Sequence, residues 1–291
     1  MRSTFYASAL NIKMHPHSPD HYISALKQVA KSRIAKQYYS ERHALIGLFY
    51  PRDRDAPLEG YEGELISFVD INPDDPWLNL SSGKTAGEDE LRKLKIPDHL
   101  KPGMRRFHFV FFPKTHRLVF ESKNTKGETL GPSSAQRAFE RLLNTEDLNL
   151  LFGPIDVIVE PEKNALDEIF KIEKLKSVTI FITRPNGDDT GDAEREIMRR
   201  LEKMNAQSTT EVYNARKGES LKLDEEAKSY AEIGSHNGYV QARGKNSANE
   251  PVFESTEQYP MKERGTVEGD QVHSESFWDK AKELVSHITR R

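Results

Sequence analysis

Residues 104–123 carry the clearest alternation of hydrophobic and polar positions in the chain. Two alternating arms are separated by a proline-containing turn, which is the pattern of a β-hairpin. In the register that this turn imposes, Phe109 lies opposite Phe120 and Phe111 lies opposite Leu118. One side of the predicted hairpin therefore faces a core, and it consists of Phe107, Phe109, Phe111, Leu118 and Phe120.

The other side of the predicted hairpin is charged. The same register places Arg106 opposite Lys123, and like charges that face each other across a sheet disfavour the pairing by up to ~1 kcal/mol. A bound anion would compensate this repulsion. The remaining cross-strand pairs expected on this side are His108 with Glu121 and Phe112 with Arg117.

Outside the hairpin, the pattern predicts strands and helices that alternate along the whole chain. Strands are expected at 4–12, 44–49, 64–71, 155–159, 177–183, 209–213, 238–243 and 252–255. The main helices are expected after Ser18-Pro19, after Ser133, at 164–173, around 197–204, after Asp224 and at 277–288. Residues 72–103 are polar and rich in proline and glycine, so they are expected to form a long loop with a short helix near 88–94.

A change in organisation occurs near Gly153-Pro154, where a polar stretch leads into a β-rich run. This predicts an N-terminal domain over residues 1–149, which contains the hairpin, and a C-terminal domain over residues 150–291, which ends in an amphipathic helix. The expected fold class is α+β or α/β, with a mixed sheet and packed helices in each domain.

Composition narrows the class of protein. The chain has 291 residues, a net charge of −3 and no cysteine, which excludes disulfides and cysteine-bound zinc. No apolar run approaches the length of a membrane span, and the first residues lack the apolar segment of a secretion signal. A cytoplasmic protein without membrane contact is expected. The net charge is not that of a strongly basic nucleic-acid binder, so a nucleic acid would bind a local patch.

The charged side of the hairpin is the candidate for such a patch. Basic groups that alternate with an aromatic ring suit a nucleic-acid backbone, because the charges neutralise phosphates and the ring stacks on a base. A solvated strand face or a dimer contact are the alternative interpretations. The candidate nucleic-acid-binding residues are Arg105, Arg106, Lys114, His116, Arg117, Lys123 and Lys126, with Lys27 and Lys31 of the first helix as an extension.

The hairpin also allows an enzymatic interpretation. Glu121-Ser122-Lys123, with Asp98 upstream, resembles the motif of PD-(D/E)xK nucleases, in which two carboxylates hold a divalent cation and the lysine stabilises charge at the attacked phosphate. In this interpretation Asp98 or Asp70 joins Glu121 at Mg²⁺, and Lys123 assists. Such a short motif occurs often by chance. Without a nuclease activity, no cofactor is expected.

Three short segments of the chain are Phe5-Tyr6-Ala7, residues 152–161 and residues 178–188. They resemble segments of the phage-exclusion family of RexA from bacteriophage lambda and of related uncharacterised bacterial proteins. The resemblance implies a cytoplasmic homodimer that contacts DNA without strong sequence preference and takes part in a response to phage infection. It implies no catalytic residue, and it does not include the hairpin.

The leading hypothesis is therefore a non-enzymatic DNA-binding protein of phage exclusion or antiphage defence. A metal-dependent nuclease and a protein-interaction module are the alternatives. A homodimer is expected. The apolar stripe of the terminal helix at 277–288, which contains Phe277 and Trp278, either contributes to the dimer contact or packs onto its own domain.

Overall fold

The computed structural model describes residues 2–72, 74–93, 97–185 and 192–289. Its largest element is an antiparallel sheet of eight strands in the order β14-β1-β8-β7-β4-β3-β2, with β9 also paired to β1. These strands are β1 (Ser3–Lys13), β2 (Lys36–Tyr39), β3 (Arg42–Pro51), β4 (Tyr61–Val69), β7 (Arg105–Phe112), β8 (Arg117–Lys123), β9 (Asp156–Val159) and β14 (Glu263–Val267).

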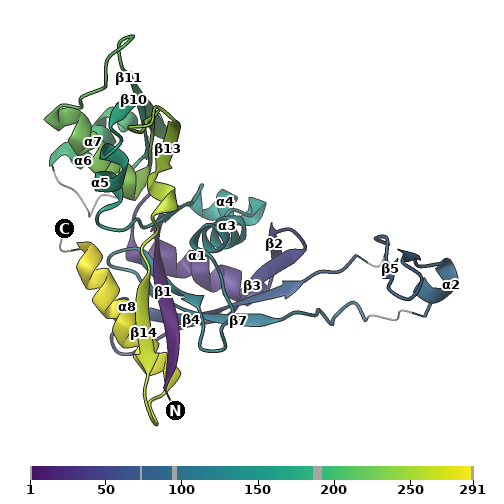
Figure 1. Cartoon of the computed structure of the whole chain (residues 1–291). Coiled ribbons are helices and arrows are strands. Elements are labelled where there is room, and N and C mark those ends of the chain that lie inside the picture. The colour runs from purple at the N-terminus through teal and green to yellow at the C-terminus, as the bar shows by residue number, and fades with distance from the viewer. Residues whose placement is uncertain (1, 73, 94–96, 186–191, 290–291) are drawn as a thin grey trace.

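Helices cover both faces of this sheet (Figure 1). On one face lie α1 (Pro19–Ser32), α3 (Pro132–Leu143) and α4 (Glu146–Phe152), whose apolar residues join the five hairpin residues predicted to face a core. On the opposite face lies α8 (His273–Thr289), which packs Phe277, Ala281 and Leu284 onto the sheet. A short 3₁₀ helix (Pro57–Glu59) connects β3 to β4.

A second antiparallel sheet has the strand order β11-β10-β12-β13. Its strands are β10 (Lys174–Thr183), β11 (Ser208–Asn214), β12 (Gly238–Lys245) and β13 (Pro251–Ser255). The helices of this part are α5 (Ala165–Phe170), α6 (Asp192–Lys203) and α7 (Glu225–Asn237), with a 3₁₀ helix at Thr256–Gln258. All three α-helices contribute to its separate hydrophobic core.

The fold is α+β, because both sheets are antiparallel and the helices pack on their faces. The sheets divide the chain differently from the boundary expected between residues 149 and 150. The strands β9 and β14 and the helix α8 all follow residue 150, yet they pack in the larger unit with β1. Chain order therefore does not coincide with spatial grouping, because the C-terminal segment returns to the first strand.

The hairpin register is confirmed, with Phe109 opposite Phe120 and Phe111 opposite Leu118. The expectation of an exposed second side is wrong over the part near the turn, whereas Arg106 and Lys123 at its other end are exposed. Val110, Phe112 and Val119 point from that side into the core beneath α8. The apolar stripe of α8 packs within its own chain, which was one of the two expected alternatives, and the buried Phe277 is not a dimer contact.

Between β4 and β7, the described residues of the segment 70–104 leave the sheet and extend away from the body (Figure 1). We call the described part of this segment, residues 70–72, 74–93 and 97–104, the arm. Its regular structure is limited to β5 (Leu78–Asn79), β6 (Lys84–Thr85) and α2 (Glu88–Leu91). The long loop and the position of its short helix were predicted. Within the described ranges, no helix has both the length and the apolar character needed to cross a bilayer.

Candidate nucleic-acid interface

The hairpin cations near the turn have carboxylate partners or are buried. Arg117 is buried, and its Nε lies 2.6 Å from Oε1 of the fully buried Glu160. His116 is completely buried. Lys114 is exposed, and its Nζ lies 2.6 Å from Oε1 of Glu59. These three predicted residues therefore do not form a free basic surface.

The other hairpin cations lie at the opposite end of the strands. Arg106 forms an ion pair with Glu64, with 2.9 Å between Nη1 and Oε2. Arg105 is half-buried, whereas Lys123 and Lys126 are exposed. The predicted patch is thus split between the two ends of the hairpin, and the part between them lies under α8.

Glu121 does not have the surroundings of a metal ligand. Its side chain is fully buried, and Oε2 accepts a hydrogen bond of 2.9 Å from the backbone N–H of His108. Its Oε1 lies 2.8 Å from Nε2 of His273, at the start of α8. Both oxygens are therefore engaged by groups from within the fold.

The carboxylates proposed to join Glu121 lie elsewhere. Asp98 is an exposed residue of the arm, and Asp70 at the base of the arm pairs with Lys101. Among the residues described, three potential metal ligands come together at Glu263, Glu283 and His287, a group that contains none of the predicted nuclease residues. The structure does not bring together the site that the short motif predicted.

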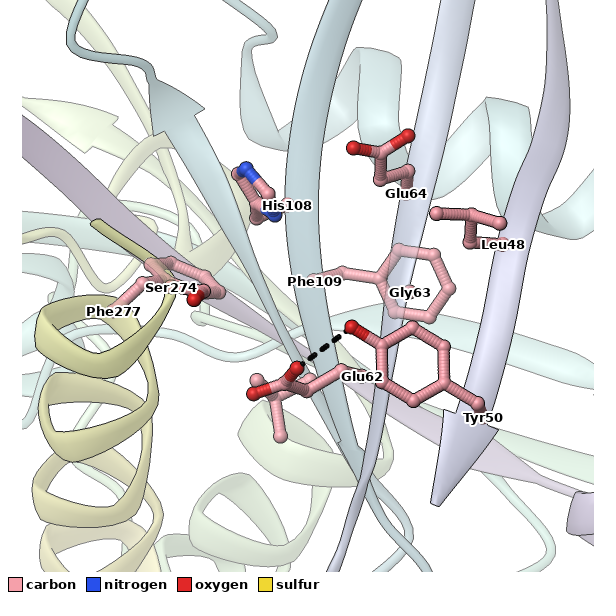
Figure 2. Close-up of a pocket in the computed structure, with 10 residues that line it drawn as sticks. Leu48, Tyr50, Glu62, Gly63, Glu64, His108, Phe109, Ser274 and Phe277 are labelled. Atoms are coloured by element: carbon pink, nitrogen blue, oxygen red, sulfur yellow. Dashed lines mark hydrogen bonds between the residues drawn. The ribbon is translucent and has the colours of Figure 1, made fainter. Parts of the chain in front are cut away.

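A small pocket lies beside the first turn of α8 (Figure 2). Tyr50 and Glu62 on one side are joined by a hydrogen bond of 3.0 Å, and Glu64 and His108 lie above them. Burial and the neighbouring Glu62 raise the pKa of Tyr50. The cavity has a volume of only about 40 Å³. It is too small for a substrate of ordinary size, and Arg52 already neutralises Glu62 at 2.8 Å.

The junction between the two sheets contains a buried polar cluster. Lys13, at the end of β1, donates to the carbonyl oxygens of Arg184 at 3.3 Å and Asn237 at 3.2 Å, and it also contacts Thr183. Burial lowers the pKa of Lys13 to about 7, and the positive charge of Arg117 adds to the effect. The lysine thus connects the last strand residues of β10 and the end of α7 to the larger sheet.

A second set of contacts completes this junction. Oε1 of Glu160 lies 2.6 Å from Nε of Arg117, and Oε2 of Glu160 lies 2.9 Å from Nδ1 of His236. Asn11 accepts from Arg117 at 3.0 Å and donates to the carbonyl of His236 at 3.1 Å. These partners come from β1, β8, α7 and the residue after β9. The cluster is a structural joint, and it explains why Arg117 is not available to a ligand.

A different basic surface surrounds the free edge of the larger sheet, where β2 is the last strand. The guanidinium of Arg137 on α3 lies 5.5 Å from the ring centroid of Tyr39, which is 58% exposed. Nη1 of Arg141, one turn further along α3, donates to the carbonyl of Gln37 at 2.7 Å. We call this region the β2-edge surface, and it consists of Lys31, Arg33, Lys36, Tyr39, Arg137 and Arg141.

Local structure places each of these side chains at the edge. Lys31 lies in the last turn of α1, and Arg33 ends that helix in a left-handed conformation with φ of 50°. The chain then enters β2 at Lys36, and α3 runs alongside β2 (Figure 1). Lysine and arginine at an edge strand also oppose unwanted pairing with another sheet.

Among the described residues, the cations of the β2-edge surface have no acidic partner, in contrast to Arg106, Lys114 and Arg117 of the hairpin. Arg105, Lys123 and Lys126 of the hairpin have no such partner in the described ranges either. Within the described residues, no carboxylate oxygen lies within 4 Å of the charged nitrogens of Lys31, Arg33, Lys36, Arg137 or Arg141. Glu41 and Glu140 are close in sequence but form no ion pair with them. The surface therefore combines uncompensated positive charge with an exposed aromatic ring.

Only part of this surface was predicted. Lys31 was among the candidate residues, and Lys27 also lies on α1, where its Nζ is 5.3 Å from the ring centroid of Tyr61. Arg137 and Arg141 were missed because they follow β2 by about a hundred residues. Their position on the polar side of a strongly amphipathic helix was the available signal.

Comparison with known proteins identifies one family. The model of the DUF4747 family, described as a domain of unknown function, matches residues 3–286. The chain therefore belongs to this family. The comparison with curated proteins found no match.

Proposed function

We propose that this member of the DUF4747 family is a non-enzymatic nucleic-acid-binding protein that contacts DNA through the β2-edge surface. The observation that supports the proposal is the group of five cations along the β2 edge that have no carboxylate partner among the described residues, one of which, Arg137, lies over the exposed ring of Tyr39. Each such cation neutralises a backbone phosphate and releases a counterion, and the ring provides a stacking surface for a base.

The chemistry of this surface favours binding with low sequence preference. Lysine and arginine contacts to phosphate position a protein on DNA but carry no direct sequence information. A ring that stacks on a base tolerates all four bases, because each has a π-face. An exposed edge with one aromatic residue suits a single strand better than a duplex, whose bases are stacked inside.

We further propose that the protein acts in the cytoplasm in phage exclusion or defence. This role rests on the short segments that resemble RexA-like proteins and on the absence of cysteine. The nuclease alternative receives less support, because both oxygens of Glu121 are engaged by His108 and His273.

Two arginine–aromatic pairs allow a matched test. Arg137 lies over Tyr39 at 5.5 Å, and Arg243 on the second sheet lies over Phe253 at 5.6 Å. Both arginines are exposed. Fluorescence anisotropy with labelled single-stranded and duplex oligonucleotides, at several salt concentrations, compares Arg137→Ala with Arg243→Ala.

The proposal predicts that Arg137→Ala weakens binding and reduces the slope of log K against log salt by about 0.7 to 0.9, the loss of one phosphate contact. Arg243→Ala is expected to bind as the wild type does. Equal effects of the two substitutions, or no binding by the wild-type protein at low salt, would contradict the proposal. Magnesium in parallel samples tests for cleavage, which would favour the nuclease instead.

A further inference from the structure

The second sheet belongs to a unit that is inserted into the larger one. The segment 162–259 contains β10 to β13 and α5 to α7, which gather at one end of the molecule (Figure 1). The chain enters this segment after β9 and leaves it before β14, and both of these strands pair with β1 of the larger sheet. We call the described part of the segment, residues 162–185 and 192–259, the inserted unit. Its hydrophobic core consists of its own residues and does not continue into the two cores of the larger sheet.

The two places where the chain crosses between the units lie side by side. Residues 160–162 run antiparallel to residues 259–261, and two backbone hydrogen bonds of 2.8 Å join them. We call these two segments the connection. A cavity of about 500 Å³ lies beside it, lined by residues of both chain segments and by His287 of α8. The connection is therefore narrow and has space on one side, as a hinge between two rigid bodies requires.

The hydrogen bonds and ion pairs between the two units are the contacts of the buried polar cluster. Lys13 provides most of them, and the others join Asn11 and Glu160 to His236, His15 to Arg184, and Asp156 to Gln207. Among the described residues, no hydrophobic cluster spans the two units. Units of one chain that meet through a small polar interface move relative to each other, whereas a large hydrophobic interface would prevent this motion.

Lys13 is the contact on which the docked position depends most. Its side chain belongs to β1 and is only 1% exposed, and its partners are uncharged oxygens of the inserted unit. They belong to Thr183 at the end of β10, to the following Arg184, and to Asn237 at the end of α7. Without Lys13, these oxygens lose a buried donor in the docked position, whereas water reaches them when the unit moves away.

We propose that the inserted unit swings as a rigid body about the connection, and that Lys13 holds it in the docked position against the larger sheet. The open position exposes the ion pair of Arg117 and Glu160 to water, while both sheets keep their hydrogen bonds. The inference does not depend on nucleic-acid binding, which uses the β2-edge surface.

Spin labels measure the position of the inserted unit directly. Because the chain has no cysteine, Ser133→Cys on α3 and Ser229→Cys on α7 provide two unique labelling sites, and both serines are exposed. Double electron–electron resonance on the full chain then gives the distances between the two labels. The labelled protein with Lys13 is expected to show mainly one distance. Lys13→Met is expected to raise the ratio of open to docked molecules by about tenfold or more, the effect of one lost buried hydrogen bond.

Two further variants test whether the effect is specific to the joint. His236→Ala removes a contact from the opposite side of the joint, so it should shift the distances in the same direction as Lys13→Met. Lys280→Met is the matched control. Its side chain is also largely buried, at 17% exposure, but both of its carboxylate partners, Glu263 and Glu283, belong to the larger unit. The control should keep the distances of the parent protein.

Hydrogen exchange distinguishes a swing from unfolding. The amides of β10 and β12, which pair within the inserted unit, should stay as protected in Lys13→Met as in the parent protein, because the core of the unit is intact. An unchanged distance distribution in Lys13→Met would overturn the proposal. A shift of equal size in Lys280→Met, or a loss of protection throughout β10 and β12, would overturn it as well.

Discussion

The hairpin and the β2-edge surface both carry several basic residues, but the two regions use them differently. In the hairpin, Arg106 and Arg117 each have a carboxylate within 2.9 Å. At the β2 edge, Arg137 and Arg141 contact a ring and a backbone carbonyl, neither of which neutralises their charge. Positive charge in a sequence therefore identifies a binding surface only after its acidic partners are known.

The largest expected effect is on the free energy of unfolding, and it differs between the hairpin and the β2-edge surface. Arg117→Ala leaves the buried carboxylate of Glu160 without its main cationic partner, so the free energy of unfolding should fall by about 3 to 5 kcal/mol. Arg137→Ala on the β2-edge surface should change it by less than about 0.5 kcal/mol, because the side chain is exposed. Urea denaturation followed by circular dichroism measures both.

A third variant tests whether the loss of stability in Arg117→Ala comes from the unpaired carboxylate. Replacing both members of the buried pair, as in Arg117→Met/Glu160→Met, removes the unpaired charge together with the pair. Part of the lost stability should return, because the penalty for a lone buried carboxylate disappears. If Arg117→Ala were as stable as Arg137→Ala, the distinction between a structural joint and a binding surface would be wrong.

The next effect concerns the aromatic ring of the β2-edge surface. Tyr39→Ala should weaken the binding of single-stranded DNA by about 1 to 3 kcal/mol, the usual contribution of one stacked base. The slope of affinity against salt should stay the same, since no cation is removed. Tyr50→Ala is a suitable control, because Tyr50 is an exposed strand tyrosine of β3, on the side of the sheet that α8 covers. Equal losses in the two variants would show that Tyr39 does not stack.

The hairpin shows how far the sequence predicts this fold. Alternation fixed its register, because one side of each arm is apolar and a slip by one residue would expose it. The same argument could not show that the part of the charged side near the turn is buried. Phe277 and Leu284, which help to cover it, follow the hairpin by more than 150 residues, and no local pattern indicates which sheet a terminal helix will cover.

The candidate site was less predictable for a related reason. The β2-edge surface depends on the packing of α3 against β2, which brings Arg141 to Gln37 across 104 positions in the chain. The sequence predicted the helix after Ser133, which is α3 with a buried side that includes Ala135 and Phe139, but it did not predict the neighbour of the polar side of α3. In the hairpin, conversely, the residues were near in sequence, and carboxylates distant in sequence compensate the charges of Arg106, Lys114 and Arg117.

For the buried junction, Lys13 is expected to make the stability of the protein depend on pH, by an amount between those of the other predictions. Burial lowers the pKa of Lys13 to about 7 in the folded protein, below its ordinary value in the unfolded chain. Between these two values the unfolded state binds more protons, so stability rises with pH. From pH 7 to pH 8 the contribution is about 1 kcal/mol.

Urea denaturation at the two pH values measures this contribution when the wild type is compared with Lys13→Met. Histidines also titrate in this range, but they are present in both proteins. Of these, His15 differs between the two proteins, because the charge of Lys13 contributes to lowering the pKa of His15, so its own titration is followed alongside by NMR. The wild type should gain about 1 kcal/mol more than Lys13→Met between pH 7 and pH 8. Equal gains would mean that the four oxygen contacts keep Lys13 charged, so that burial does not control its protonation.

The smallest expected effect comes from two single lysines, one in each region. Lys114 is an exposed hairpin residue whose ammonium group lowers the pKa of Glu59 through a hydrogen bond, so its charge is already compensated. Lys36 lies in β2 and has no carboxylate partner among the described residues.

Lys114→Ala should leave the thermal midpoint, the DNA affinity and the salt slope unchanged, as is usual when an exposed ion pair is removed. Lys36→Ala should retain the same thermal midpoint but reduce the salt slope by about 0.7 to 0.9. The two measurements together reverse the sequence-based expectation, in which Lys114 was a contact and Lys36 was not. If Lys114→Ala reduced the salt slope and Lys36→Ala did not change it, the hairpin and not the β2-edge surface would be the binding surface.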